Sequence, residues 1–473
     1  MLSRLILVEY YWSRPKDSRT PLGHASLLAA LRAEKVVDVL SVTHPVNDPE
    51  WSSETLASSI LCAAAEQPEG TCAVGFGVYV WNDAQVQDVI RCLRSRGYTG
   101  PILLGGPQIT WANEPLGDLY PQADWFIRGF AEQAIIDWCR RFDTNEAMPQ
   151  GVYRAGEQPP YLAAQASLES VPSPYLNGEI PLGAQKFVRW ETSRGCRYKC
   201  TFCQHRGDQQ KVRPVVQAER LLREIELFCA TGVESIAVLD PVFTDSPHAM
   251  TVLRSFRERG YRGRLSLQCR PETMTEEILD AMHGLNVCLE FGIQTTNRLE
   301  SEIVERPNNL RQIEITLQRV QERGIDHEIN LIFGLPAQTL DTFRESVRWC
   351  IDRRVKTIRA FPLMMLRGTA LAQNRGHWNF TESSDPIPHV ISSSSFSRSD
   401  WQKMRGIADA LDKSTGTHPP TLEDLDELVD SIFDSGSQWS PAPLNSWAAA
   451  NESRPTAKSS TTLLTPDALL QCA

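Results

Sequence analysis

Short apolar runs alternate with amphipathic stretches along the first 143 residues, and the two patterns predict different elements. The apolar runs predict buried strands; they are residues 5–10, 72–81, 100–106 and the start of 124–142. The amphipathic stretches predict helices; they are residues 21–35, 82–98 and the rest of 124–142. Strands that alternate with helices are typical of a doubly wound parallel sheet, whose ligands bind at the carboxyl ends of the strands.

A second alternation follows residues 144–185, a stretch rich in Pro, Gly and polar residues that we expect to be a linker. Helical patterns such as 215–232 and 308–324 then separate six more strand patterns, at residues 186–193, 233–240, 263–270, 286–294, 327–336 and 355–364. This α/β order predicts a partial (β/α)6 barrel of the TIM type over residues 186–380, with an active site at the carboxyl ends of its strands.

The end of the chain has a different pattern. Residues 381–412 contain one helical pattern, at 391–412, and form a predicted C-terminal extension that either closes the barrel's mouth or packs beneath it. From residue 413 to 473, Ser, Thr, Pro and Asp dominate, and such a composition cannot bury much apolar surface. We therefore expect a disordered tail.

Charge and composition exclude several classes of protein. The 473 residues carry a formal net charge of −10, which argues against a protein that grips a nucleic-acid backbone. No run approaches the roughly 20 apolar residues that span a bilayer, and the amino terminus lacks a signal-peptide pattern. The 12 cysteines are scattered rather than arranged as a disulfide framework, which indicates a reducing cytoplasm.

Three of the cysteines, Cys196, Cys200 and Cys203, crowd into one loop after the first barrel strand. A disulfide would leave one of them unpaired. A structural zinc is possible with His205 as the fourth ligand, but zinc ligands usually come as two separated pairs. Three soft thiolates on one loop favour a [4Fe–4S] cluster with one iron left open.

These residues also carry a resemblance. The motif Cys196-x-x-x-Cys200-x-Phe202-Cys203, within "ETSRGCRYKCTFC", resembles the signature of the radical S-adenosylmethionine (SAM) enzymes whose radical domain follows a cobalamin-binding domain. Downstream, "LDPVFTDSP", "CRPETMTEEIL", "LEFGIQTTN" and "LIFGLPAQTLDTFRESV" are similar to the same family in order and spacing. Upstream, "PLGHASLLAALR", "VGFGVYVWN", "ILLGGPQIT" and "WFIRGFAEQA" resemble the cobalamin-binding half, so the likeness covers about residues 1–380.

The resemblance implies roles for individual residues. The three cysteines would hold the cluster, its open iron would bind SAM, and Phe202 would lie near the adenine. Asp240 would fix the SAM ammonium, although a loop cap is the alternative role. Arg270, Glu290 and Gln294 end later strands and would face SAM or substrate, unless they form ion pairs or hydrogen bonds inside the barrel.

For cobalamin, the resemblance implies a groove lined by Tyr79, Trp81, Gly105 and Gly106. The family often has an Asp-x-His-x-x-Gly loop that supplies a histidine to cobalt, and this chain lacks it. His24 stands in a helical apolar stripe, which predicts a core or surface histidine. The chain is therefore compatible with cobalamin bound without a histidine ligand, or with a domain that kept the fold and lost the ligand.

The function so implied is reductive cleavage of SAM to a deoxyadenosyl radical, used for cobalamin-dependent methylation of an unactivated carbon in a biosynthetic pathway. The alternatives are a cobalamin-independent oxidation, cyclisation or epimerisation, and a zinc-stabilised binding protein without catalysis. A methylthiotransferase acting on tRNA is disfavoured by the acidic charge. The expected partners are a small-molecule or peptide substrate and an electron donor such as flavodoxin or ferredoxin, with neither nucleic acid nor membrane.

Overall fold

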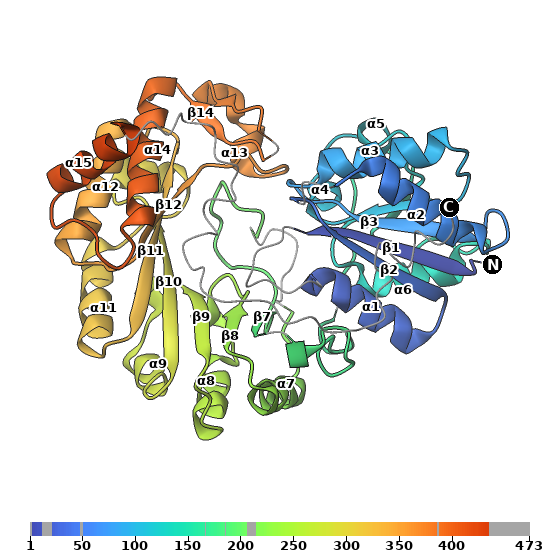
Figure 1. The fold of residues 1–473 in the computed structure, drawn as a ribbon, viewed down its shortest axis with the longest axis horizontal. Coiled ribbons are helices and arrows are strands. Elements are labelled where there is room, and N and C mark those ends of the chain that lie inside the picture. The colour runs from blue at the N-terminus through green and yellow to red at the C-terminus, as the bar shows by residue number, and fades with distance from the viewer. Residues whose placement is uncertain are drawn as a thin grey trace. The chain divides into compact units, whose positions relative to one another are not determined.

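The computed structural model describes residues 2–434 apart from 12–20, 48–50, 166, 185, 206–213 and 386. These residues form two compact units, each with its own sheet (Figure 1). The first unit comprises residues up to 186 together with 214–231, and the second comprises residues 187–205 and 232–434. The division after residue 186 falls where the predicted linker ends.

The first unit contains a six-stranded sheet in the order β2-β1-β3-β4-β5-β6. Its strands are β1 (Arg4–Tyr11), β2 (Asp38–Pro45), β3 (Cys72–Gly77), β4 (Ile102–Gly105), β5 (Trp125–Ile127) and β6 (Val152–Arg154). All neighbours are parallel except β5 and β6. The four predicted strands are confirmed. The sequence missed β2, a half-buried edge strand, and also β6, so the stretch 144–185 is more than a linker.

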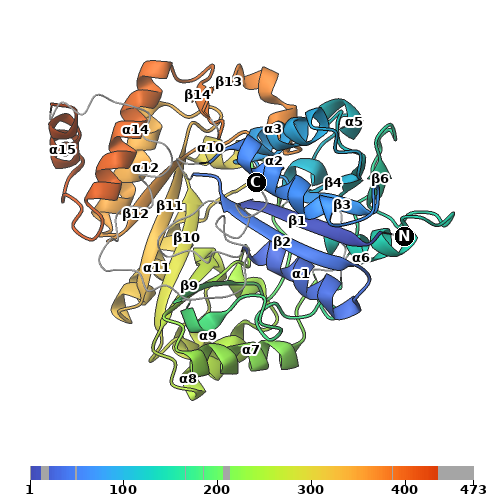
Figure 2. The same ribbon diagram turned by 45° about the vertical axis from the view of Figure 1, so that its right-hand side comes forward.

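Helices cover both faces of this sheet (Figures 1 and 2). α1 (Leu22–Glu34) and α6 (Ala131–Arg141) lie on one face, and α2 (Ser53–Ala65) and α3 (Asp83–Ser95) on the other. Successive residues of β1 serve the two faces: Leu5 packs with α1 and α6, and Ile6 packs with α2 and α3. Burial on both faces explains why the strands read as continuous apolar runs. The unit's remaining helices are α4 (Pro107–Thr110), α5 (Leu116–Leu119), α7 (Ala218–Thr231) and the 3₁₀ turn η1 (Leu182–Ala184).

The second unit contains six parallel strands, each beside its predecessor in the chain. They are β7 (Phe187–Trp190), β8 (Ser235–Val238), β9 (Arg264–Cys269), β10 (Asn286–Gln294), β11 (Asp326–Phe333) and β12 (Ile358–Pro362). This is the predicted (β/α)6 order. Between the strands lie η2 (Phe243–Asp245), α8 (Ala249–Glu258), η3 (Pro271–Thr273), α9 (Glu276–Ala281), α10 (Arg298–Ile303), α11 (Leu310–Glu322) and α12 (Leu340–Asp352).

The C-terminal part packs onto this barrel. It contains α13 (Ala370–Gln373), η4 (Arg375–Trp378), β13 (Thr381–Glu382), β14 (Val390–Ser392), α14 (Arg398–Lys413) and α15 (Leu422–Asp434). The predicted helix at 391–412 is α14, which starts at a Ser397–Asp400 capping box and packs against β12 and α12. α15 lies where a disordered tail was expected, and Arg344 holds it through two 2.6 Å hydrogen bonds to Asp426. The rest of the expected tail, 435–473, lies outside the described residues.

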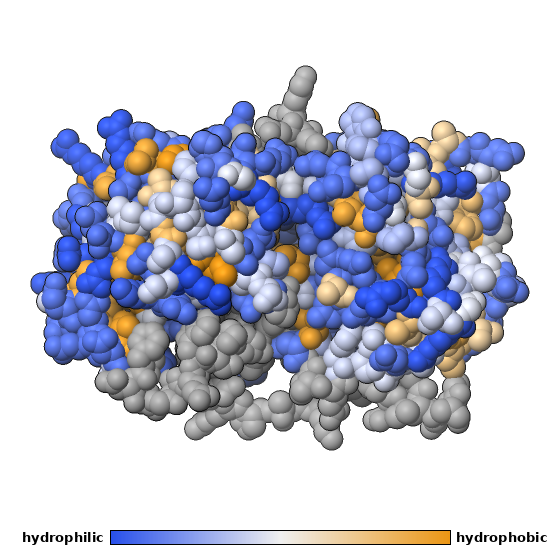
Figure 3. Space-filling model, turned by 90° about the horizontal axis from the view of Figure 1, so that it is seen from above, coloured by the Kyte–Doolittle hydropathy of each residue, from blue (hydrophilic) through white to orange (hydrophobic). Residues whose placement is uncertain are grey.

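In the described part of the chain, every helix is too short or too polar to cross a bilayer. The face shown in Figure 3 is mainly hydrophilic, and its hydrophobic residues are scattered. The large apolar side chains that are exposed are few among the described residues: Leu162, Leu299, Ile315, Phe361 and Met364.

Candidate active site

The cysteine loop follows β7 directly, as the sequence predicts, and lies at the carboxyl end of the barrel strands. Cys200 is buried, and Cys196 and Cys203 are half-buried. Gly195 turns the chain just before the first cysteine with a φ of +81°, a backbone conformation that favours glycine.

The start of the loop is tied to Asp240, which follows β8. The backbone N–H groups of Thr192 and Ser193 donate to Asp240 Oδ1, at 2.8 and 3.1 Å. Their hydroxyl groups donate to Asp240 Oδ2, at 2.5 and 2.6 Å. The Asp240 side chain is fully buried. The sequence predicted Asp240 as a site residue, and the structure brings it to the cysteine loop.

The middle of the loop contacts the segments that follow β8 and β9. Arg197 Nε lies 2.8 Å from Asp245 Oδ2. The guanidinium of Arg270 stacks over the Tyr198 ring, 4.1 Å from its centroid, and also donates to Pro307 O at 3.1 Å. Arg270, another predicted site residue, therefore has its aromatic partner inside the cysteine loop.

The end of the loop contacts segments that follow β10 and β12. Arg306 Nη1 lies 3.8 Å from Cys200 Sγ, and Arg306 Nη2 donates to Gly292 O. Thr201 N donates to Val304 O at 3.0 Å, and Leu371 N donates to Thr201 O at 2.9 Å. Between Thr192 and Thr201, the loop is thus held at its start, middle and end by the connections at the carboxyl end of the sheet.

Electrostatics link the three thiols to one another. Burial is the main cause that raises the pKa of Cys203 to about 11; an N–H from His205 opposes the shift, and Cys200 and Cys196 add to it. In the described residues, however, no three His, Cys, Asp or Glu side chains converge closely enough to form a ready-made metal site.

The surroundings of the thiols fit an anionic metal cluster. Burial lowers the pKa of Arg306, and the nearby Arg270 guanidinium lowers it further, so two cations lie close together beside the loop. Arg306 Nε and Thr201 Oγ1 are both buried without a hydrogen-bond partner. Buried cations require a compensating charge. A [4Fe–4S] cluster held by three thiolates carries net negative charge and prefers this soft donor set.

The other predicted residues lie nearby without a demonstrated role. Phe202 is half-buried within the loop, and Glu290 is half-buried on β10. Gln294 ends β10 with a φ of +71°, next to a shift in strand register. The roles of these three side chains stay predictions.

Three residues of the site were not predicted from the sequence: Thr192 and Ser193, at the start of the loop, and Arg306, which contacts its end. Thr192 and Ser193 stand in the quoted motif, but the sequence pattern assigned them no partner. Arg306 lies 103 positions after Cys203 in an irregular segment, where no periodic pattern marks it. The long separation in sequence explains the omission, because only the folded barrel brings the two segments together.

The residues predicted to bind cobalamin stand at the carboxyl ends of β3 and β4, which are neighbouring strands. Tyr79 and Trp81 stack with ring centroids 4.6 Å apart. A Cβ atom at Gly105 would meet only Ile127 O, at 3.8 Å, so this glycine leaves free space. A Cβ atom at Gly106 would lie 2.7 Å from Val78 O, so that glycine serves backbone packing instead. The aromatic pair and Gly105 thus stand at the carboxyl ends of neighbouring parallel strands, the end of a doubly wound sheet at which ligands bind.

Several titratable side chains are buried in the same unit, among them His24 and Glu9. His24 is 3% exposed and bonds Ser41 Oγ at 2.8 Å, which makes it the core histidine that the sequence predicts. Glu9, on β1, is 4% exposed, and burial holds the pKa of its carboxyl well above the usual range. The Glu9 charge in turn raises the pKa of Tyr79. Glu9 was not predicted as a site residue, because it stands singly in an otherwise apolar strand.

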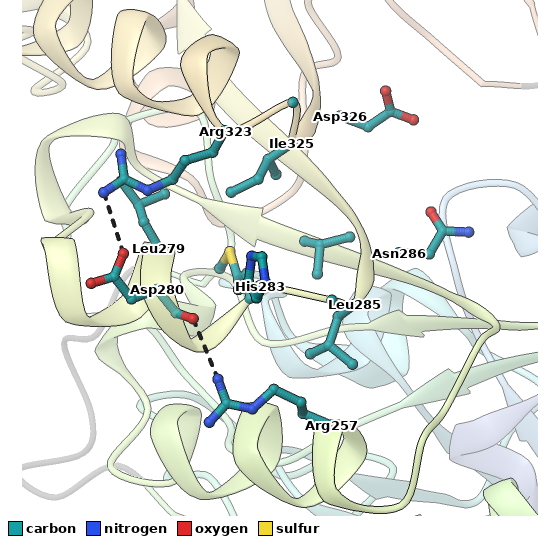
Figure 4. A pocket seen from close by; sticks show the side chains of 13 residues that line it. Arg257, Leu279, Asp280, His283, Leu285, Asn286, Arg323, Ile325 and Asp326 are labelled. Atoms are coloured by element: carbon teal, nitrogen blue, oxygen red, sulfur yellow. Dashed lines mark hydrogen bonds and ion pairs between the residues drawn. The ribbon is translucent and has the colours of Figure 1, made fainter.

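A cavity of about 730 Å³ lies at the other end of the barrel (Figure 4). It is lined by Asn286 and Asp326, the first residues of β10 and β11, and by the loop around His283. Arg323 points toward Asp280 across it, at 3.3 Å. Because catalytic residues of such barrels lie at the carboxyl ends of the strands, this cavity is not the candidate site.

Comparison with known families identifies the second unit. Residues 190–350 match the model described as the radical SAM superfamily. These residues are a radical SAM domain. The match runs from the last residue of β7 into α12, so the radical SAM domain includes the cysteine loop, Asp240, Arg270 and Arg306.

Three relatives extend the likeness beyond the radical SAM domain. The chain is 26% identical over 296 residues to the cobalamin-dependent radical SAM methyltransferase TokK of Streptomyces tokunonensis, covering 57% of this chain and 43% of TokK. The figures are the same for the 2-(S-pantetheinyl)-carbapenam-3-carboxylate methyltransferase of Streptantibioticus cattleyicolor. The chain therefore spans less than half the length of these relatives.

The third is a solved structure, the radical SAM methyltransferase TsrM from Kitasatospora setae with cobalamin and a [4Fe–4S] cluster bound. It superposes with a TM-score of 0.64 and 18% sequence identity, covering 85% of this chain and 82% of TsrM. At that identity the likeness shows the fold. It establishes the two-part α/β architecture that the sequence predicted.

Proposed function

We propose that this protein is a cobalamin-dependent radical SAM methyltransferase that methylates an unactivated carbon of a small molecule in a biosynthetic pathway. One observation carries the proposal: the loop with the three cysteines contacts two buried guanidinium groups at the carboxyl ends of the barrel strands, Arg306 at Cys200 and Arg270 at Tyr198. That setting suits an anionic iron–sulfur cluster far better than a neutral structural site.

The protein's own residues bind and position the reactants. Cys196, Cys200 and Cys203 would hold the cluster, and burial of Cys200 keeps water from its sulfur. Arg306 places its guanidinium 3.8 Å from that sulfur, where it would offset the negative charge of a bound cluster. When bound, the cluster supplies the electron that breaks the sulfonium C–S bond of SAM.

The first unit would hold cobalamin through shape rather than through a cobalt ligand. Tyr79 and Trp81 present a flat apolar surface, and Gly105 leaves room beside it. His24 is unavailable to cobalt because it is buried and bonded to Ser41, with a pKa of about 4. When bound, cobalamin supplies the carrier of the methyl group.

The chemistry of the relatives supports a small-molecule substrate. TokK and the carbapenam carboxylate enzyme are named as methyltransferases, and TsrM has been solved with tryptophan as substrate. The cobalamin-independent reactions and the zinc-stabilised binding protein are less favoured, since the named relatives combine SAM radical chemistry with methylation. A reducing partner such as flavodoxin or ferredoxin would supply the electron.

The test is anaerobic reconstitution with iron, sulfide and hydroxocobalamin, followed by desalting and visible spectroscopy. We expect a broad iron–sulfur band and retained corrin absorption in the wild type. The iron–sulfur band should disappear in Cys196→Ala, Cys200→Ala and Cys203→Ala. Cys92→Ala, a half-buried helical cysteine of the first unit, is the matched control and should keep both signals.

The outcomes separate the parts of the proposal. An iron–sulfur band without corrin absorption would refute cobalamin dependence and leave a cobalamin-independent radical enzyme. Zinc in place of iron would refute the radical mechanism altogether. With both cofactors bound, transfer of a labelled methyl group from SAM to carbon remains the decisive assay for methylation.

A further inference from the structure

The carboxylate of Asp240 is completely engaged by the cysteine loop. Its Oδ1 accepts from the N–H groups of Thr192 and Ser193, and its Oδ2 accepts from their two hydroxyl groups, at distances between 2.5 and 3.1 Å. A carboxylate has about four lone-pair sites, and all four are used here. No capacity remains for an ammonium group of a ligand.

The position of Asp240 in the sheet explains these bonds. Trp190 of β7 is paired in register with Val238 of β8, and the last backbone bond between them runs from Leu239 N to Trp190 O at 2.7 Å. Two positions further in that register, Thr192 is opposite Asp240, just beyond the point where the ladder stops. The side chain of Asp240 therefore continues the pairing of the two strands into the loop.

The same β8–α8 connection holds the other side of the first cysteine. Arg197, directly after Cys196, pairs with Asp245 at 2.8 Å. Cys196 thus lies between two anchored points, with Gly195 turning the chain between them. Loss of the first anchor would free the residues that lead into the cysteine motif.

We propose that Asp240 is a positioning residue that acts on Thr192 and Ser193 and thereby fixes Cys196, rather than a ligand of the SAM ammonium. The inference rests on the proposed function, because it concerns the cluster and SAM. It matters for the chemistry because a cluster ligand that shifts changes how firmly the metal is held.

Two substitutions distinguish the roles. In Asp240→Asn, the amide oxygen still accepts from both N–H groups, and the amide nitrogen donates to both hydroxyl oxygens, each of which can accept. The anchor survives without the charge. Asp240→Ala removes the anchor and leaves two backbone N–H groups without acceptors. An ammonium-binding carboxylate would be impaired by both changes, and an anchor only by the second.

The variants are reconstituted anaerobically and compared with wild type by iron retained against a chelator, by the EPR spectrum of the reduced cluster with and without SAM, and by the Kd for SAM. For Asp240→Asn we expect iron retention and EPR spectra like wild type, and a Kd within about threefold. For Asp240→Ala we expect iron affinity lower by roughly ten- to a hundredfold. If that variant does not fold, Thr192→Val with Ser193→Ala removes the hydroxyl donors and should weaken iron retention in the same direction.

Two results would overturn the inference. The first is a SAM Kd raised roughly tenfold or more in Asp240→Asn with iron and EPR unchanged, which would make Asp240 a charge partner of the ligand. The second is wild-type iron retention and EPR in Asp240→Ala, or in the double variant where that one does not fold. Failure of the wild type itself to hold iron would instead refute the proposed function.

Discussion

Gly106 offers a sharp test of how the first unit is built. Its φ of +93° and ψ of 179° lie in a region that is essentially restricted to glycine. A Cβ atom there would also lie 2.7 Å from Val78 O and 2.9 Å from Val78 N, which are backbone atoms that cannot rotate away. Val78 O accepts from Gln108 N at 3.1 Å, so any shift also disturbs this turn. Gly106→Ala should therefore be strongly destabilising.

The magnitude follows from the backbone. A residue forced into such a conformation costs about 1–3 kcal/mol, and the two backbone contacts place Gly106→Ala at the upper end, about 3 kcal/mol. For a unit of this size, each kcal/mol lowers Tm by roughly 2–4 °C, which gives about 6–12 °C. Differential scanning calorimetry of the apoprotein measures the transition of the first unit.

Gly105→Ala is the matched control, one residue away. Its Cβ would meet only Ile127 O at 3.8 Å, so we expect a Tm close to that of the wild type. The added methyl group fills the proposed groove and should weaken cobalamin binding by about tenfold or more. The reasoning would be refuted if Gly106→Ala melted within about 1 °C of wild type, or if both variants lost the same stability.

Three further predictions concern buried polar groups of the first unit. Burial raises the pKa of the Glu9 carboxyl, so the stability that Glu9 contributes is complete below its unfolded pKa near 4.5 and is lost as pH rises. Glu9→Gln should therefore raise Tm at pH 8 and not at pH 4. An equal gain in Tm at both pH values would contradict this. Burial lowers the pKa of His24 from 6.5 to about 4, so the free energy of unfolding should fall as pH drops from 6.5 to 4. His24→Asn should make this fall smaller, as measured by urea titrations at a series of pH values. Asn82 is fully buried; its side chain accepts from Tyr79 N at 2.7 Å and donates to Gly77 O at 2.9 Å and Tyr10 O at 3.3 Å. Asn82→Ala should lower the free energy of unfolding in urea by roughly 2–4 kcal/mol. A loss under about 1 kcal/mol would show that the turn holds without this side chain.

Much of the fold could be predicted from the sequence because it depends on local patterns. Four strands of the first sheet appear as apolar runs, since strands covered on both faces favour apolar residues throughout. The six barrel strands were predicted from short apolar or alternating patterns, such as the buried alternate positions of β11. The pattern failed at the edges. β2 is half-buried, β6 has three residues, and α15 stands in a polar, acidic stretch where its Asp426 pairs with Arg344 of α12.

For the site, the sequence by itself determined the cysteine motif and its place after the first barrel strand, because the spacing of metal ligands in one loop is a local property. Only the tertiary structure decided what surrounds that loop. Arg306 reaches Cys200 from 106 residues away, and Asp240 reaches Thr192 from 48 residues away. Such partners depend on the register of neighbouring strands, and a single sequence does not encode register in any local pattern.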